Sequence, residues 1–132
     1  MDELRQMLIV AAGGALGSVA RYRLSGWVLH QTLDWRFPLG TFVVNVVGCL
    51  MVGVLAGLAI RQDFFSTDVR LLLFTGLMGG FTTFSAFGLE TFYLLRRGEY
   101  LIAGGNMLLS VAVGMAALFA GYHLIASRVT PA

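Results

Sequence analysis

The sequence predicts an all-α membrane protein with four transmembrane helices, the third of which is broken in mid-membrane. Of the 132 residues, 58% are hydrophobic and only 12% are charged, whereas a soluble domain carries about 25% charged residues. Apolar runs long enough to cross a bilayer alternate with short polar segments. One run carries glycines and hydroxyl residues near its middle, where lipid offers no partner to backbone polar groups.

The predicted spans form a single transmembrane domain over residues 1–132, at about 7–29, 39–60, 71–95 and 100–125. The chain starts with acidic residues, Asp2 and Glu3, and no small-residue cleavage site follows. A secretory signal begins with basic residues instead, so we expect the first span to be retained as structure.

The connections carry signals for where helices end and begin. Pro38 with Gly40 predicts the start of the second span. Ser66, followed by Thr67 and Asp68, is typical of a helix N-cap before the third span. The third span ends with two cations and a glycine, as helix C-termini prefer; these are Arg96, Arg97 and Gly98.

The arginines are divided almost evenly between the two sides of the membrane. The chain has no lysine. Four spans place on one side Arg5, Arg61, Arg70 and Arg128, and on the other Arg36, Arg96 and Arg97. The difference in positive charge between the two sides is too small for the positive-inside rule to set one orientation. This favours insertion in both orientations and an antiparallel homodimer. The alternative is a single orientation, set by a weak charge bias in one loop. Scattered cations also argue against a nucleic-acid partner.

Three polar side chains at membrane depth are candidate functional residues, because such placement costs free energy. Arg21 lies deep in the first span, whereas Arg23 can snorkel to the interface. Asn45 in the second span either forms a hydrogen bond between helices or donates a hydrogen bond to an anion. Glu90 in the third span is either a proton carrier or a hydrogen-bonded structural residue.

In the fourth span Asn106 and Ser110 share one helical face and form a short polar track. The sequence has no nucleophile–base pair and no phosphate-binding loop, so it does not predict an enzyme.

The segment from Gly79 to Phe87 combines a glycine pair, three hydroxyl residues and three phenylalanines. The rings alone would predict a packing ridge, but the interleaved hydroxyls and the glycines favour an ion site. We expect the helix to break at the glycine pair. Ring edges are electropositive and can bind a small anion weakly, as conduction requires. Freed carbonyls between Gly79 and Thr82 would instead hold a cation.

These residues resemble the small bacterial fluoride channels, also called the camphor-resistance CrcB family. Motifs in all four predicted spans carry the resemblance. They are Gly-Ala-Leu-Gly with Arg21, Gly40-Thr41 with Val44-Asn45, Gly-Gly-Phe-Thr-Thr-Phe-Ser-Ala-Phe with Glu90, and Ser110. Together with the length and the number of spans they make a specific match.

The resemblance implies an antiparallel, dual-topology homodimer with two pores along the dimer interface, in the bacterial inner membrane. It implies a passive channel that exports cytoplasmic fluoride and so gives fluoride resistance. Phe84 and Phe87 would line the pore with their ring edges toward fluoride. The other implied members of the pathway are Asn45, Ser110, Arg21 and Thr83, with Asn106 as a possible member of the polar track. A structural sodium ion at the dimer centre would be held by main-chain oxygens of Gly79 and Thr82 from both subunits.

Three positions depart from the family's pattern. Asn106 stands where a pore tyrosine is frequent, Gly114 where a serine can occur, and Ala86 where a hydroxyl residue is common. A thinner polar track would affect the conduction rate without requiring a change in selectivity.

Two other function classes remain open from the sequence. A small proton-coupled multidrug transporter also has four spans, and here Glu90 would have to exchange the proton. A noncatalytic membrane assembly subunit would leave the spacing of the arginine, asparagine and phenylalanines unexplained.

Overall fold

The computed structural model describes residues 2–60 and 64–129, and within them all regular structure is helical, as predicted. The first two long helices are α1 (Asp2–Gln31) and α2 (Leu39–Leu58). The third crossing is built from four consecutive pieces: α3 (Thr67–Arg70), the π-helix η1 (Leu71–Met78), α4 (Gly79–Phe81) and α5 (Phe84–Arg96). The last is α6 (Tyr100–Val129).

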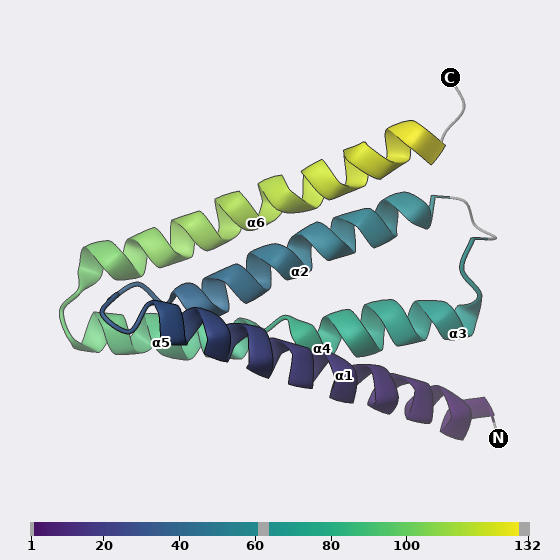
Figure 1. Cartoon of the computed structure of the whole chain (residues 1–132), viewed down its shortest axis with the longest axis horizontal. Helices are drawn as coiled ribbons and strands as arrows, with labels where there is room; N and C mark the ends of the chain where they lie inside the picture. Colours follow the sequence, from purple (N-terminus) through teal and green to yellow (C-terminus); the bar gives the residue numbers. More distant parts are fainter. Residues whose placement is uncertain (1, 61–63, 130–132) are drawn as a thin grey trace.

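The crossings alternate in direction along one long axis, and both termini lie at the same end (Figure 1). α2 runs beside α6, and α1 runs beside η1 and α4. α5 extends the third crossing toward the far end, where it packs on α6. This alternation gives the described arginines the two-sided distribution expected from the sequence; Arg61 lies outside the described residues.

Among the described residues, three helical segments are long and apolar enough to cross a membrane: Leu39–Leu58, Thr67–Arg96 and Tyr100–Arg128. The chain is therefore a multi-pass membrane protein. α1 does not meet the same standard of length and composition, so its role as a fourth span stays a prediction. The observed helices extend past the predicted ends of the first, third and fourth spans, whereas α2 ends slightly earlier.

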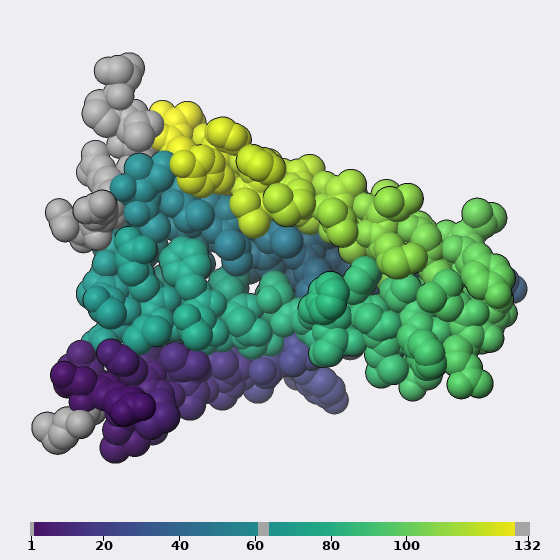
Figure 2. Space-filling view, turned by 180° about the vertical axis from the view of Figure 1, so that it is seen from behind, coloured from purple at the N-terminus to yellow at the C-terminus, as the bar shows by residue number. Residues whose placement is uncertain are grey.

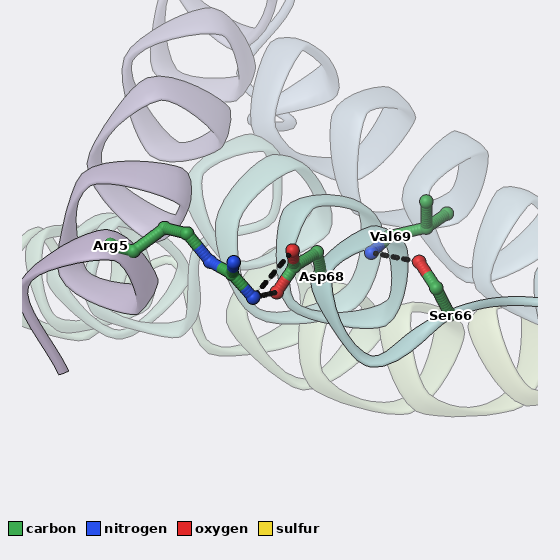
Figure 3. A network of polar contacts seen from close by, with 4 residues as sticks. All are labelled: Arg5, Ser66, Asp68 and Val69. Atoms are coloured by element: carbon green, nitrogen blue, oxygen red, sulfur yellow. Dashed lines mark hydrogen bonds and ion pairs between the residues drawn. The ribbon is translucent and has the colours of Figure 1, made fainter. Parts of the chain in front are cut away.

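The helix ends follow the predicted local chemistry. Pro38 precedes α2, and its carbonyl accepts from the amide of Phe42 at 3.2 Å. The Ser66 side chain caps α3 by accepting from the Val69 amide at 3.3 Å (Figure 3). After α5, Gly98 has a φ of 78°, a left-handed conformation that glycine adopts without steric cost.

The loop after α5 forms a Schellman motif. The Gly98 amide donates to the Leu95 carbonyl at 3.0 Å, and the Glu99 amide donates to the Leu94 carbonyl at 2.9 Å. The last carbonyls of α5 are satisfied in this way.

Small residues let the helices approach closely. A Cβ added to Gly13 would lie 2.6 Å from the Leu72 carbonyl oxygen, and one added to Gly80 would lie 2.5 Å from that of Gly14. Backbone contact of this kind is how helices associate in lipid, where no hydrophobic force drives them together. The crossing of α1 over η1 and α4 therefore depends on glycines on both sides.

Few apolar side chains are fully enclosed by one chain. The central cluster is Val44, Met78 and Phe81, packed against half-buried neighbours from α1, α2 and η1. Outward-facing leucines are highly exposed, with Leu101 at 93% and Leu108 at 75%. A surface this apolar fits lipid or another membrane-embedded protein surface.

Candidate functional site

The third crossing loses its helical conformation at Thr82 and Thr83, both of which are extended. The prediction of a broken helix is confirmed, but its expected position at the glycine pair is wrong. Gly79 and Gly80 are helical and belong to α4. The physical reason is that Gly80 is needed for its close approach to α1, whereas the break is stabilised by side-chain hydrogen bonds to the threonines.

Asn45 of α2 holds the break open. Its Nδ2 donates to the Thr83 carbonyl and its Oδ1 accepts from the Thr83 amide, both at 2.9 Å. One carboxamide thus satisfies both main-chain groups of a residue that has left the helix, as a neighbouring strand would. The structure favours a local structural use of Asn45, which the sequence had left open beside an anion-donor role.

The threonines finish one helix and begin the next. The amide and hydroxyl of Thr82 both donate to the Met78 carbonyl, at 3.0 and 2.9 Å. The Thr83 hydroxyl accepts from the Ala86 amide at 3.2 Å and is the N-cap of α5. The amide end of α5, where the helix dipole is positive, therefore starts at Phe84.

Arg21 reaches the break from α1. Its Nε donates to the Gly80 carbonyl at 3.0 Å, next to the end of α4. A cation is favourable at the C-terminal end of a helix, where carbonyls lack partners. Arg21 also lines a cavity of about 430 Å³ with Thr83 and Glu90. Arg23, by contrast, is exposed, as expected for a side chain that extends to the interface.

Glu90 is hydrogen-bonded rather than free. The Thr41 hydroxyl of α2 donates to Glu90 Oε1 at 2.7 Å. Thr41 and Asn45 therefore both face the third crossing, as their spacing on one helix face predicts. The other carboxyl oxygen, Oε2, is buried and has no hydrogen-bond partner among the described residues.

The three phenylalanines of the segment have different environments. Phe81 is only 5% exposed and belongs to the core cluster, whereas Phe84 is 83% exposed. The rings of Phe84 and Phe87 form a pair with centroids 5.6 Å apart and planes inclined by 41°. Phe81 therefore has a packing role, and the other two rings lie at the start of α5.

The polar track of α6 is connected to α5. The Ser110 hydroxyl donates to Asn106 Oδ1 at 3.2 Å, and Asn106 Nδ2 donates to the Thr91 hydroxyl at 2.9 Å. The Thr91 hydroxyl in turn donates to the Phe87 carbonyl at 2.8 Å. Thr91 was not predicted from the sequence. It lies four residues after Phe87 on the same helix face, a spacing too common in apolar spans to distinguish it.

Hollows lie on both sides of Thr83. The cavity with Arg21 and Glu90 lies on one side. The second, of about 330 Å³, is lined by residues of α2, the break and α6: Asn45, Cys49, Val52, Thr82, Thr83, Phe84 and Leu118. Figure 2 shows a hollow between α6 and the third crossing with α2 behind it. Thr83 therefore borders both hollows, and Asn45 borders the second.

Two main-chain oxygens near the break lose their usual helical partners. The amide that would donate to the Gly79 carbonyl belongs to Thr83, and it donates to Asn45 instead. The amide that would donate to the Thr82 carbonyl belongs to Ala86, and it donates to the Thr83 hydroxyl. Carbonyl oxygens released in this way are hard ligands of the type that alkali and alkaline-earth cations prefer.

The chain matches the family model described as CrcB-like protein, Camphor Resistance (CrcB), over residues 8–122. A protein from Methylobacillus flagellatus, named fluoride-specific ion channel FluC, is 58% identical over 120 residues, covering 91% of this chain and 94% of the relative. One of the same name from Rhizobium etli is 48% identical over 124 residues, covering 94% and 98%. Another, from Geotalea uraniireducens, is 45% identical over 108 residues, covering 82% and 86%. The chain therefore belongs to the CrcB-like, camphor-resistance family.

Proposed function

We propose that this protein is a fluoride-specific ion channel that lets cytoplasmic fluoride leave the cell by passive diffusion. The relatives named as fluoride channels align with nearly its whole length. The observation that carries the proposal is the pair of Phe84 and Phe87 rings at the amide end of α5, in which Phe84 is exposed and Phe87 is half-buried. The family assignment agrees with the prediction that the chain is not an enzyme.

The chemistry of this pair suits a small anion that must keep moving. Ring edges carry partial positive charge, and the start of α5 adds the positive end of a helix dipole. Neither supplies a full charge at the rings, so binding is weak enough to release the ion. Fluoride that enters a cell as neutral HF ionises inside, and the channel then returns the anion to the outside.

The remaining pathway residues have supporting roles. Arg21 places positive charge beside the Thr83 cavity and attracts the anion toward the break. Asn45 keeps the Thr83 main chain in its extended form. Ser110 adds a hydroxyl on α6 to the polar side of the path.

A second, inverted copy of the chain completes each pore in this proposal. Phe84 is 83% exposed on one protomer, so a pore wall needs another surface opposite it. The apolar outer faces supply such a surface, and the even arginine distribution permits both insertion orientations. The bacterial inner membrane is the proposed location, since fluoride must leave the cytoplasm there.

A structural sodium ion at the dimer centre fits the residues present. The Gly79 and Thr82 carbonyls, whose helical donors are engaged elsewhere, would hold it together with those of the second copy. A buried cation there would favour anions nearby. The Gly80 carbonyl is a poorer candidate ligand because Arg21 already donates to it.

Fluoride efflux from liposomes under an imposed gradient, with chloride as the control ion, tests the function. We expect rapid fluoride efflux from the wild type and strongly reduced efflux with Phe84→Ile or Phe87→Ile. Phe92→Ile is the matched control, because Phe92 is an exposed ring on α5 outside the pair. Absent fluoride flux in the wild type, or unchanged flux in both pair variants, would sink the assignment.

Neither competing function class gains support. The relatives reported above are all named as fluoride channels. The Thr41 hydroxyl donates to the Glu90 carboxyl group. This bond fits a structural role for Glu90 better than the role of a carboxylate that exchanges protons. Proton-linked efflux of a quaternary ammonium ion from the same liposomes would revive the transporter hypothesis.

A further inference from the structure

Asn106 is the most enclosed polar side chain in the described part of the chain, with an exposed fraction of 1%. It projects from α6, and its carboxamide has partners on both sides. Nδ2 faces the Thr91 hydroxyl of α5, and Oδ1 faces the Ser110 hydroxyl one turn along α6. An amide buried without such partners would be costly, so its position is closely constrained.

The direction of every hydrogen bond in this chain follows from its last member. The Phe87 carbonyl can only accept a hydrogen bond, so the single hydroxyl proton of Thr91 must be donated to it. Thr91 then has only lone pairs to offer Asn106, and the nitrogen of the carboxamide must face it. The oxygen of the carboxamide is thereby turned to Ser110, whose hydroxyl must donate.

This chain of bonds joins α6 to the main chain at one of the two proposed fluoride-binding rings. Thr91 is 6% exposed, so its bonds are largely protected from competition by water. α5 and α6 are otherwise joined by few neighbouring residues compared with the extensive pairing of α2 with α6. The bond from Asn106 to Thr91 is a polar link between α6 and α5 at this level.

We propose that Asn106 is a positioning residue for fluoride conduction, which acts through Thr91 on the Phe87 main chain and is not itself an anion ligand. This inference rests on the proposed function. It assigns a role to the asparagine that replaces the tyrosine frequent in the family. Asn106 sets how far α5 lies from α6 at the level of Phe87, and hence where the Phe87 ring stands relative to α6.

The test is the unitary fluoride current in planar bilayers, which is recorded only from folded, inserted channels. Asn106→Leu and Thr91→Val keep the approximate side-chain volume and remove the link from either side. Losing one buried hydrogen bond of this kind is expected to lower the current roughly tenfold in each variant. The double variant is expected to conduct within about twofold of Asn106→Leu, because both changes break the same link.

Thr91→Ser keeps the hydroxyl and is expected to restore most of the current lost in Thr91→Val. The matched control is Thr32→Val. Thr32 in the α1–α2 connection makes the same bond to a carbonyl four residues earlier, also at 2.8 Å, but has no side-chain amide partner among the described residues. Thr32→Val is expected to conduct like the wild type.

Several outcomes would overturn the inference. If Asn106 binds fluoride directly, Thr91→Val conducts like the wild type while Asn106→Leu loses current. Losses that multiply in the double variant would show that the two residues act independently, and they also contradict the inference. Equal currents in Thr91→Ser and Thr91→Val also contradict it, even if Asn106→Leu yields no channels. A wild type without fluoride current refutes the proposed function itself, whereas a conducting wild type with multiplied losses refutes only the role of Asn106.

Discussion

Gly17 allows α1 to lie against the main chain of the third crossing, and Gly17→Ala tests how much depends on that contact. A Cβ at this position would lie 2.8 Å from the Phe81 amide nitrogen and still closer to the Leu77 carbonyl oxygen. Both obstacles are backbone atoms and cannot rotate away. The helices must therefore separate by at least about 0.6 Å to reach ordinary contact.

That separation has a calculable effect at the break. The Arg21–Gly80 hydrogen bond is 3.0 Å long and lies one turn beyond Gly17 on α1. Moving α1 outward would lengthen it to about 3.6 Å, which no longer qualifies as a hydrogen bond. Overpacking costs about 1–3 kcal/mol and the gain in helix propensity returns about 1 kcal/mol, so we expect a net loss of about 0–2 kcal/mol.

Gly14→Ala is the matched control on the same helix. A Cβ there would meet only the Gly76 carbonyl oxygen at 3.9 Å, which is ordinary contact. Gly14→Ala should therefore gain about 0.5–1 kcal/mol from helix propensity without separating the helices.

Unfolding by sodium dodecyl sulfate, followed by tryptophan fluorescence, measures the stability difference between these two variants. Fluoride efflux of the same preparations reports on the break, and we expect Gly17→Ala to be slower than Gly14→Ala. The reasoning is refuted if Gly17→Ala proves as stable as Gly14→Ala, because the close backbone contact would then not constrain the helices.

Three further changes test individual contacts. Asn45→Leu leaves both main-chain groups of Thr83 without partners and should destabilise the protein by about 2–4 kcal/mol in the same unfolding assay; a loss under 1 kcal/mol would mean that water replaces the amide. Ser66→Ala removes a helix cap and should cost about 1 kcal/mol with no change in fluoride efflux, and altered efflux would contradict this separation. Arg5→Ala breaks a pair with Asp68 whose side chains are 63% and 39% exposed, joined at 3.0 Å (Figure 3), so the loss should stay below about 1 kcal/mol and shrink in high salt. A larger loss that salt does not change would show that this pair is not screened.

The parts of the fold that were predicted correctly depend on residues close together in sequence. The start of α2 after Pro38, the Ser66 cap and the left-handed Gly98 each follow from the chemistry of a few neighbouring residues. The helical class and the approximate spans follow from apolar runs, because lipid requires each crossing to satisfy its own backbone.

The site was predicted less completely. Asn45 was identified from its type and its depth in the span, and Phe84 and Phe87 were implied by the family resemblance, but the break was placed at the glycines. Glycine can adopt both helical and non-helical conformations, so the pair Gly79-Gly80 does not by itself indicate where the helix breaks. Thr91 was missed because a lone threonine in an apolar span has no distinguishing pattern, although it proves to be a buried link to α6.

The sequence by itself determined that this is an all-helical membrane protein whose third crossing is interrupted near its middle, since composition and local spacing suffice for both. Only the tertiary structure decided where that crossing opens and which groups hold it. Asn45 and Thr83 are 38 residues apart, and Arg21 and Gly80 are 59 apart. Such bonds exist only after the helices have packed, because each main-chain group takes its partner from whichever side chain the packing brings within reach.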